Sequence, residues 1–365
     1  MIKALKTRQI CFFYIAILPV IKFFMMPSLV CETAGEDLWI SVLINCLFDF
    51  TAIFIVYLCL KDADCDFFTL IERLFGKAFA KTVAAIYAVF FLLKTVMPLN
   101  EVKDYVEMTL YITSPNIFTF MPVFALIIFV CIHHMRVIGR IADGVLIVAL
   151  IGYAFMFALA LPNTDFEALL PVGARGAKNI LQGSYVSEPW FNDCAYFLFF
   201  TGNHVKGKKD GLKIFASVAV SAIIVIFFCM LFYGTFTSIA FRQRFALTEI
   251  SKYTTVINNT ERFDYIPIFA LLFTAVFSLA LPFYFATDLF LRLLPVKRNL
   301  AAIIISLPSA ILLLFFEEYF ATIETFITQI ASGFFILFGT VFPAVLAVVM
   351  KIRLNKENKL EIQRG

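Results

Sequence analysis

Ten long apolar stretches constrain the fold of this chain more than any other feature of its sequence. A helix needs about 20 apolar residues to cross the roughly 30 Å hydrocarbon core of a bilayer. Inside that core every backbone N–H and C=O group needs a partner within the protein, and a helix provides one along its length. The stretches therefore predict an all-α integral membrane protein with ten spans. The spans are expected over residues 9–31, 37–60, 82–108, 117–134, 141–162, 187–205, 213–236, 265–291, 299–316 and 323–350.

The composition agrees with this prediction and excludes the water-soluble classes. Hydrophobic residues make up 62% of the chain and charged residues 15%, and the mean hydropathy is +0.91. Ordinary globular proteins have roughly 45–50% apolar and about 25% charged residues, and a soluble fold cannot bury so much additional apolar surface. The Lys and Arg residues occur in short runs between apolar stretches, with no basic stripe. The sequence thus predicts contact with the lipid bilayer and not with nucleic acid.

The residue types that usually carry catalysis or bind metals form no recognisable set in the sequence. None of the eight cysteines lies in a Cys-x-x-Cys pair, and most lie within apolar stretches, where they are expected to pack as small side chains. His133, His134 and His204 lie at predicted span ends and make no ligand set with the cysteines. The sequence shows no nucleophile–base pair and no phosphate-binding loop either. It predicts neither an enzyme nor a bound metal or cofactor.

The distribution of Lys and Arg predicts the orientation of the chain. One set of loops and termini carries 21 of these residues, and the opposite set carries 7. Since cytoplasmic loops are enriched in Lys and Arg, both termini are expected in the cytoplasm, with residues 351–365 as a cytoplasmic tail. The two long loops on the opposite side, residues 162–188 and 237–264, are each expected to contain a short helix.

Ten spans with both termini on one side divide into two five-span halves of opposite orientation. Within a single transmembrane domain over residues 1–365, residues 1–162 form the first five-span repeat and residues 163–350 the second. Five is odd, so span 1 starts inside, span 6 starts outside, and inversion relates the halves. Transporters built in this way bind their substrates near the midplane, between interrupted spans.

The first span of each half is interrupted at a comparable place. Pro19 and Pro27 interrupt span 1, and Glu188-Pro189 with the polar pair Asn192-Asp193 interrupts span 6. Proline removes a backbone donor and breaks a helix locally. Backbone groups freed within the membrane must line a cavity or be buried in protein. The paired interruptions therefore indicate a ligand site at the midplane, and simple proline kinks are the alternative.

Five of the ionisable residues within the predicted spans are candidates for the site, and each costs about 2.5–3.5 kcal/mol on insertion scales. They are Lys22, Asp49, Lys94, Glu101 and Asp193. Lys22 lies about 20 Å along its span, at 1.5 Å per residue, so its ammonium group is far from the headgroups. It is expected to face the bundle interior. There it either forms a structural ion pair with an acidic residue of a neighbouring span or serves as a fixed positive charge beside a binding cavity.

Several segments of the sequence resemble the spore germination permease family, the B subunits of spore nutrient germinant receptors. The most specific are Met26-Pro27-Ser28-Leu29 and the stretch Glu36-Asp37-Leu38-Trp39-Ile40-Ser41-Val42-Leu43, which follow Thr7-Arg8-Gln9. The loop Leu169-Leu170-Pro171-Val172 is similar to the family's loop before span 6. Phe191-Asn192-Asp193 falls where the wider amino acid–polyamine–organocation superfamily has an aromatic–Gly–acidic element.

The resemblance implies a LeuT-like fold of two inverted five-span repeats with broken spans 1 and 6. It also implies a pocket between these spans, walled by spans 3 and 8, for a small nutrient such as an amino acid. The family's B subunits act with a membrane-bound A-type subunit and a lipoprotein C-type subunit in the inner membrane of a bacterial endospore. The same partners and location are therefore expected for this chain.

The ligand-binding residues expected from the resemblance lie at the two breaks. Family members have small residues such as Gly-Ser at the first break, and Gly and Glu at the second, where this chain has Asn192 and Asp193. Lys22 either supplies the positive charge for a ligand carboxylate or fills the site itself. Asp49, Lys94 and Glu101 are the candidate charge partners. The expected ligand-binding residues are Val20, Ile21, Lys22, Phe23, Phe191, Asn192 and Asp193.

The function expected from the resemblance is nutrient sensing by a germinant receptor. The alternative is a secondary transporter of amino acids or related small organic solutes, coupled to protons through Asp193 or Glu101. A structural membrane subunit with a degenerate pocket is a third interpretation. Genes for A-type and C-type partners beside this one would favour the sensor, and an isolated gene would favour the transporter.

Overall fold

Long helices build most of the chain that the computed structural model describes, which comprises residues 5–63, 65–109, 116–202, 204–205, 207, 209–252 and 265–364. Seven helical segments in this part are long and apolar enough to cross a membrane, and Phe120–Ile132 is a shorter apolar helix. A helical membrane protein is thus confirmed, while the count of ten spans and their inverted 5+5 arrangement stay predictions. The long helices are α3 (Leu38–Leu60), α5 (Lys77–Thr109), α6 (Asn116–Ile132), α7 (Met135–Ala160), α10 (Asp210–Phe236), α12 (Tyr265–Leu293), α13 (Arg298–Phe315) and α16 (Phe342–Arg364).

Two of the predicted spans are series of short helices. Pro19 directly precedes one of the short turns and Pro189 lies in another, so the interruptions occur where the sequence predicts them. The first series is α1 (Thr7–Phe12), the π-helical turn η1 (Phe13–Ile17), the 3-10 turn η2 (Val20–Phe23) and α2 (Met26–Ala34). The second series is α8 (Gly176–Ser187), the 3-10 turn η6 (Glu188–Trp190) and α9 (Asp193–Phe200).

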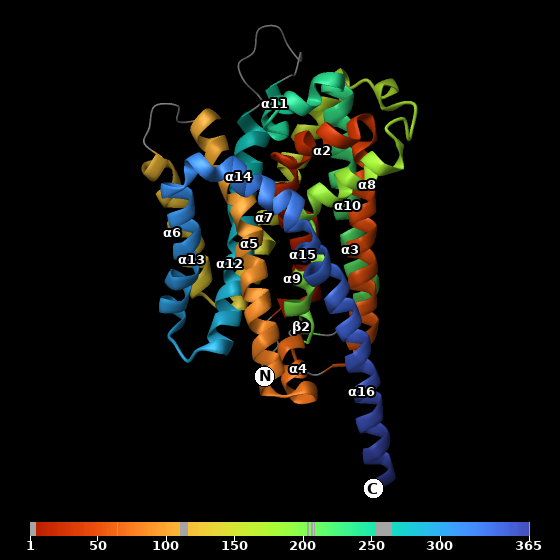
Figure 1. Cartoon of the computed structure of the whole chain (residues 1–365), viewed down its shortest axis with the longest axis vertical. Helices are drawn as coiled ribbons and strands as arrows, with labels where there is room; N and C mark the ends of the chain where they lie inside the picture. Colours follow the sequence, from red (N-terminus) through yellow and green to blue (C-terminus); the bar gives the residue numbers. More distant parts are fainter. Residues whose placement is uncertain are drawn as a thin grey trace.

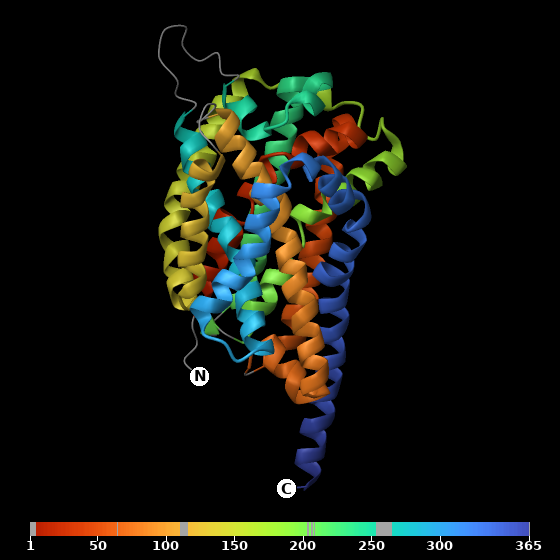
Figure 2. The ribbon, with the colours of Figure 1, turned by 60° about the vertical axis from the view of Figure 1, so that its left-hand side comes forward.

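The last predicted span also changes its helical geometry along its length. Two of its segments, η9 (Phe326–Ile330) and η10 (Leu337–Val341), are π-helical, and π-helical turns within α-helices are frequent at functional sites. The span passes beside the second broken series, because η10 contacts α9 and α15 contacts η6. Its final helix, α16, continues past the end of the bundle (Figures 1 and 2). The segments are α14 (Phe320–Thr325), η9 (Phe326–Ile330), α15 (Ser332–Ile336), η10 (Leu337–Val341) and α16.

Short elements complete the described structure. At the end where α16 projects lie α4 (Phe67–Phe75) and the strands β1 (Leu5–Lys6) and β2 (His204–Val205), which pair in parallel (Figure 1). Helix α11 (Ala246–Lys252) confirms the short helix expected in the second long loop, and residues 253–264 of that loop lie outside the described part. In the first long loop, α8 is a helix that leads directly into the second break, so the broken series begins before the predicted start of span 6 at residue 187. The remaining 3-10 turns are η3 (Gly35–Asp37), η4 (Leu161–Asn163), η5 (Glu167–Leu169), η7 (Thr237–Arg242) and η8 (Glu317–Tyr319).

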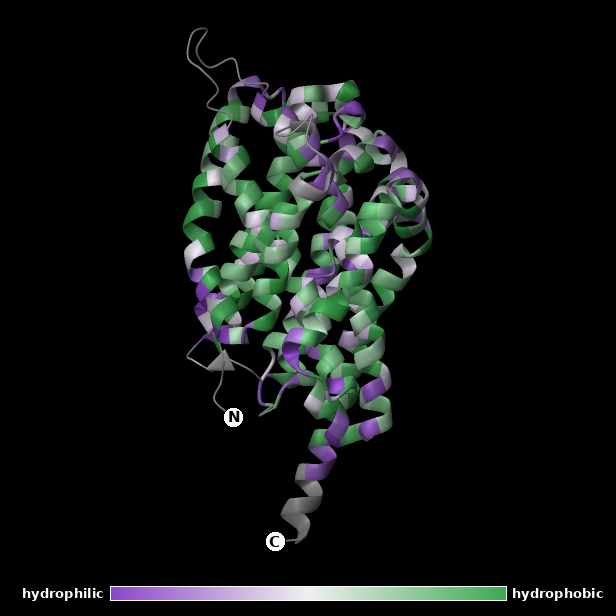
Figure 3. Ribbon diagram, turned by 90° about the vertical axis from the view of Figure 1, so that its left-hand side faces the viewer, coloured by the Kyte–Doolittle hydropathy of each residue, from purple (hydrophilic) through white to green (hydrophobic). Residues whose placement is uncertain are grey.

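Apolar residues cover the middle of the bundle, and polar residues gather toward its two ends (Figure 3). Large apolar side chains on the outside are exposed, among them Phe48 (56%), Ile147 (63%) and Ile223 (64%). Soluble monomers rarely expose contiguous apolar surface on this scale. These side chains are therefore the ones expected to contact lipid.

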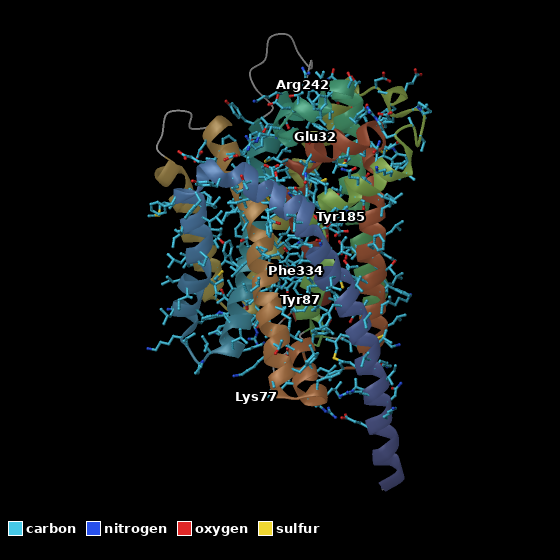
Figure 4. All side chains as sticks on the ribbon, in the orientation of Figure 1. Glu32, Lys77, Tyr87, Tyr185, Arg242 and Phe334 are labelled. Atoms are coloured by element: carbon cyan, nitrogen blue, oxygen red, sulfur yellow. The ribbon has the colours of Figure 1, made fainter. Side chains whose placement is uncertain are left out.

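The two ends of the bundle present different parts of the predicted topology. Glu32 and Arg242 lie at one end, and Lys77 lies at the other, toward which the C-terminal helix α16 also runs (Figure 4). A predicted cytoplasmic loop and the predicted cytoplasmic tail thus lie on the same side. The charge distribution predicts that this end, with Lys77, is cytoplasmic.

A labelling experiment tests this orientation. Lys77 and Arg242 are both exposed, and each is replaced by Cys in a protein whose half-buried cysteines, Cys59 and Cys65, are replaced by Ser. A membrane-impermeant maleimide is expected to label the Arg242→Cys protein in intact cells. It is expected to label the Lys77→Cys protein only after permeabilisation. Reversed labelling would contradict the predicted topology and, with it, the assignment of inverted repeats.

Candidate functional site

The first break is a four-residue turn enclosed by two prolines. Pro19 lies directly before the turn Val20–Phe23, and the Lys22 N–H donates to the Pro19 carbonyl at 2.9 Å. Pro27 lies in the first turn of α2, where a helix does not need the N–H that proline lacks. All four residues of the turn are buried, and Lys22 is only 2% exposed. The turn therefore holds an ammonium group inside the protein and away from lipid.

The side chains of this turn serve different purposes. The Phe23 ring packs against Phe228 of α10, at 4.4 Å between centroids, and against Tyr153 of α7, at 5.7 Å. Phe23 thus fixes the first break to two other helices. Val20 and Ile21 are buried as well, and only Lys22 reaches a charged group of the second break.

The second break depends on a residue in the left-handed conformation. Asn192 has φ 68° and ψ 41°, directly before α9 begins at Asp193. Asn adopts this conformation more readily than most other non-glycine residues, which explains how it occupies a position where the resemblance predicts Gly. Its amide nitrogen donates to the Glu188 carbonyl at 2.7 Å and to the Glu188 carboxylate at 3.1 Å. Its amide oxygen accepts from the Thr340 hydroxyl at 3.2 Å, which joins this break to the last span.

Lys22 and Asp193 join the two breaks as an ion pair. The Lys22 Nζ atom lies 2.6 Å from Asp193 Oδ2 and 4.6 Å from the centroid of the Phe191 ring. The two charged side chains are 3% and 9% exposed, so water screens their charges little. The Tyr14 hydroxyl donates to the Asp193 carbonyl at 3.2 Å. Removing one partner of a buried pair leaves an uncompensated charge, which typically costs about 3–5 kcal/mol.

The other two acidic candidates contact the backbone and an indole group. Asp49, in α3, accepts a hydrogen bond from the Cys194 N–H at 3.4 Å, at the end of α9 where N–H groups lack helical partners. Glu101, in α5, accepts from the Met25 N–H at 3.3 Å and from Trp190 Nε1 at 2.7 Å. Glu101 therefore braces both broken series against α5. Within the described residues neither carboxylate forms a direct ion pair with Lys22 or Lys94.

Lys94 is the second buried ammonium group, and its partners are backbone carbonyls. It lies in α5 and is 2% exposed. Its Nζ atom donates to the carbonyl of Pro189, at 3.3 Å, and to that of Phe191, and the Tyr196 ring centroid is 5.5 Å away. The carbonyls lie where the helical segment α8–η6 ends, and helix ends have acceptors without helical partners and a partial negative charge.

The sequence predicts both sides of the ion pair but not several residues that surround it. Thr340 and Gly339 belong to the last span, and a methyl group added at Gly339 would lie 2.5 Å from Asn192 Cβ. Trp190 directly follows the interrupting Glu188-Pro189, so its place in the sequence was a usable signal. A Gly-Thr pair within an apolar stretch carries no such signal.

A cavity of about 570 Å³ lies next to the first break. Met25, whose N–H binds Glu101, forms part of its lining, and Glu32, at the Arg242 end of the bundle in Figure 4, forms another part. In its wall Arg244 Nη2 lies 2.7 Å from Asp104 Oδ2. The cavity thus lies between the Arg242 end of the bundle and Met25, which follows the first break. Its carboxylates belong to Glu32, Asp104, Glu107, Glu318 and Glu324.

Comparison with protein families decides the membership of the chain. The sequence model of the spore permease family, described as spore germination proteins, matches residues 4–324. The chain belongs to the spore germination protein family. The family predicted from the segments around Pro27 and Trp39 is therefore confirmed, and the chain is a membrane protein of a germination-related, permease-type family.

Known structures and curated proteins add little to this membership. A manganese transporter from Eremococcus coleocola, solved in complex with an aromatic bis-isothiourea substituted compound, is similar over 98% of this chain and 85% of its own. The identity is 11% and the TM-score 0.44. No curated protein matches the sequence significantly.

Proposed function

We propose that this spore germination protein is the membrane subunit of a nutrient germinant receptor and binds a small zwitterionic nutrient, an amino acid being the simplest, between Lys22 and Asp193. The buried ion pair that joins the two broken helices is the observation that carries this proposal. Val20–Phe23 and Phe191–Asn192 form the immediate surroundings of the nutrient. The 570 Å³ cavity beside Met25 is its route from the spore exterior.

The chemistry of the pair selects a zwitterion. A carboxylate of the nutrient binds the Lys22 ammonium, and its amino group binds the Asp193 carboxylate, so one internal ion pair is exchanged for two. Every buried charge keeps a partner during this exchange. A ligand with a single charge leaves either Lys22 or Asp193 unpaired, and an unpaired buried charge typically costs about 3–5 kcal/mol. The positive end of the α9 helix dipole adds a further attraction for the carboxylate.

Binding signals germination because it separates the two breaks. In the structure Lys22 contacts Asp193, so the two breaks are held together by this ion pair. A ligand shifts a conformational equilibrium only if it binds one of the two states more tightly. A nutrient between the two charges fits only the state in which Lys22 and Asp193 are apart. Glu101 and Thr340, which contact the broken series, pass the displacement to α5 and to the last span.

The partners and location in this proposal follow from the family. The chain acts with A-type and C-type receptor subunits in the inner membrane of a bacterial endospore, with both termini in the cytoplasm. The alternative, a secondary transporter of amino acids or related solutes, makes a different prediction. Proteoliposomes that contain a transporter accumulate the labelled nutrient, whereas those that contain a sensor bind it without accumulation.

A ligand series tests the zwitterion requirement. For an amino acid that triggers germination through this protein, we expect the corresponding amine and the corresponding carboxylic acid to be at least about tenfold weaker, since each leaves one buried charge unpaired. The measurement is the germination dose–response and, in parallel, the thermal shift of the purified chain. The enantiomer, which keeps both charges, is the control for shape. Equal potency of the amine or the acid would contradict the proposal.

A further inference from the structure

Lys94 holds the end of a broken helix with a full positive charge. Its ammonium donates to the carbonyls of Pro189 and Phe191, which are the last acceptors before the chain turns at Asn192. No carboxylate forms an ion pair with it among the described residues. Two backbone carbonyls and the face of the Tyr196 ring therefore form its immediate environment.

This environment is the kind that proteins offer to a free monovalent cation. Backbone carbonyls replace the hydration shell of alkali-metal ions in channels, and the C-terminal ends of interrupted helices coordinate such ions in transporters. An aromatic face adds electrostatic attraction for ammonium ions. Here the cation is covalently attached to α5 and cannot leave.

The surrounding charges explain why a cation is needed at this place. Three buried carboxyl groups, of Asp49, Glu188 and Asp193, belong to or contact the second break, and their side chains are almost fully excluded from solvent. Lys22 supplies one positive charge to this group. The carbonyls at the end of η6 add partial negative charge on the same side. A second positive charge close to the break is therefore favoured electrostatically.

We propose that the Lys94 ammonium is a tethered monovalent cation that holds the second break closed in place of a dissociable alkali-metal or ammonium ion. The proposal does not depend on a nutrient, because it concerns the α5 contact and not the Lys22–Asp193 pair. Two consequences follow. The natural protein needs no alkali-metal ion for its fold, and a Lys94→Ala protein has an open site that a free ammonium ion enters.

Thermal unfolding of the purified full-length chain in detergent tests both consequences. The wild-type midpoint is expected to be the same in choline, sodium and potassium chloride at equal ionic strength. The Lys94→Ala protein is expected to unfold at a lower temperature in choline chloride. Ammonium or methylammonium chloride is expected to raise its midpoint saturably toward the wild-type value. Lys94→Met is the matched control, because its apolar side chain fills the same space without a charge, and no rescue is expected.

Several results would overturn the inference. One is a wild-type protein that sodium or potassium stabilises relative to choline, since it then binds a dissociable ion. Another is a folded Lys94→Ala protein that no cation rescues, or that responds no more than Lys94→Met. If Lys94→Ala does not accumulate, Lys94→Gln decides, because its amide keeps hydrogen bonds to the carbonyls without the charge. A Lys94→Gln protein as stable as wild type contradicts the inference, and one with a clearly lower midpoint supports it.

Discussion

Lys22→Met and Asp193→Asn are each expected to raise the nutrient concentration for half-maximal germination at least tenfold. Each substitution removes one charge that the zwitterion contacts in a site where water screens little. Loss of one partner of a desolvated charge pair typically costs about 2–5 kcal/mol, which is roughly 30- to 5000-fold in affinity at about 1.4 kcal/mol per decade. The measurement is a dose–response curve on spores with equal amounts of the variant protein, determined by immunoblot.

Two controls separate ligand binding from a structural role of the pair. Arg73→Met removes one partner of an exposed pair with Glu357, at 3.1 Å, and is expected to leave the curve unchanged, because exposed pairs contribute little. The double variant Lys22→Met/Asp193→Asn has no unpaired charge. If the pair were only structural, the double variant would accumulate better than either single variant, and neither single variant would shift the curve. Normal accumulation with an unmoved curve would favour a subunit with a degenerate pocket.

The position of the candidate site could be predicted because burial of charge and interruption of a helix both appear in the sequence. A lysine about 13 residues into the first apolar stretch has few polar surroundings available for its charge, and prolines and polar residues mark the breaks. In the structure the Lys22 ammonium group accordingly forms an ion pair with the Asp193 carboxylate. Such signals depend on residue type and depth within one span, so a single sequence is sufficient to find them.

The partners of the other ionisable residues could not be predicted, because they depend on contacts between distant spans. Lys94 and Glu101 looked equally suited to pair with a charge of opposite sign. In the structure Lys94 binds carbonyl groups and Glu101 binds a backbone N–H and an indole. Every residue carries a backbone N–H or C=O group, so the sequence gives no indication of which one is free. The breaks at Val20–Phe23 and Asn192 determine where such groups become available.

The fold was predictable at the level of helices and less so where helices change type. The expected span 37–60 and the observed α3 (Leu38–Leu60) agree closely, because the thickness of the bilayer sets the number of apolar residues that a spanning helix needs. The π-helical turns in the last span, which bring Gly339 and Thr340 to Asn192, had no counterpart in the hydropathy pattern. A π-helical turn differs from an α-helical one only in that each backbone hydrogen bond reaches one residue further along the chain. The apolar composition of the segment is the same in both cases.

Gly339→Ala is expected to destabilise the protein by at least about 2 kcal/mol, because overpacking a close-packed site typically costs about 1–3 kcal/mol and here also displaces a hydrogen-bonded side chain. The new methyl group would lie 2.5 Å from Asn192 Cβ and closer still to its amide oxygen, which accepts from Thr340. Gly333→Ala, in the same span, is the matched control. Its methyl group would meet only the Tyr185 hydroxyl, at 3.6 Å. It is expected to be neutral or slightly stabilising, since Ala favours a helix by about 1 kcal/mol over Gly.

A second substitution identifies the cause of the loss. Asn192→Gly removes the side chain that the methyl group would strike, and Gly adopts the left-handed conformation at φ 68° without strain. Asn192→Gly/Gly339→Ala is therefore expected to be more stable than Gly339→Ala alone, although Asn192→Gly by itself loses the hydrogen bonds to Glu188 and Thr340. A pair of residues in contact gives such non-additive effects, whereas independent sites add. If the change in unfolding midpoint of the double variant equals the sum of the changes in the two single variants, residues 192 and 339 do not compete for the same space. Recovery would show that a small residue at position 339 is what allows this chain to have Asn at the second break.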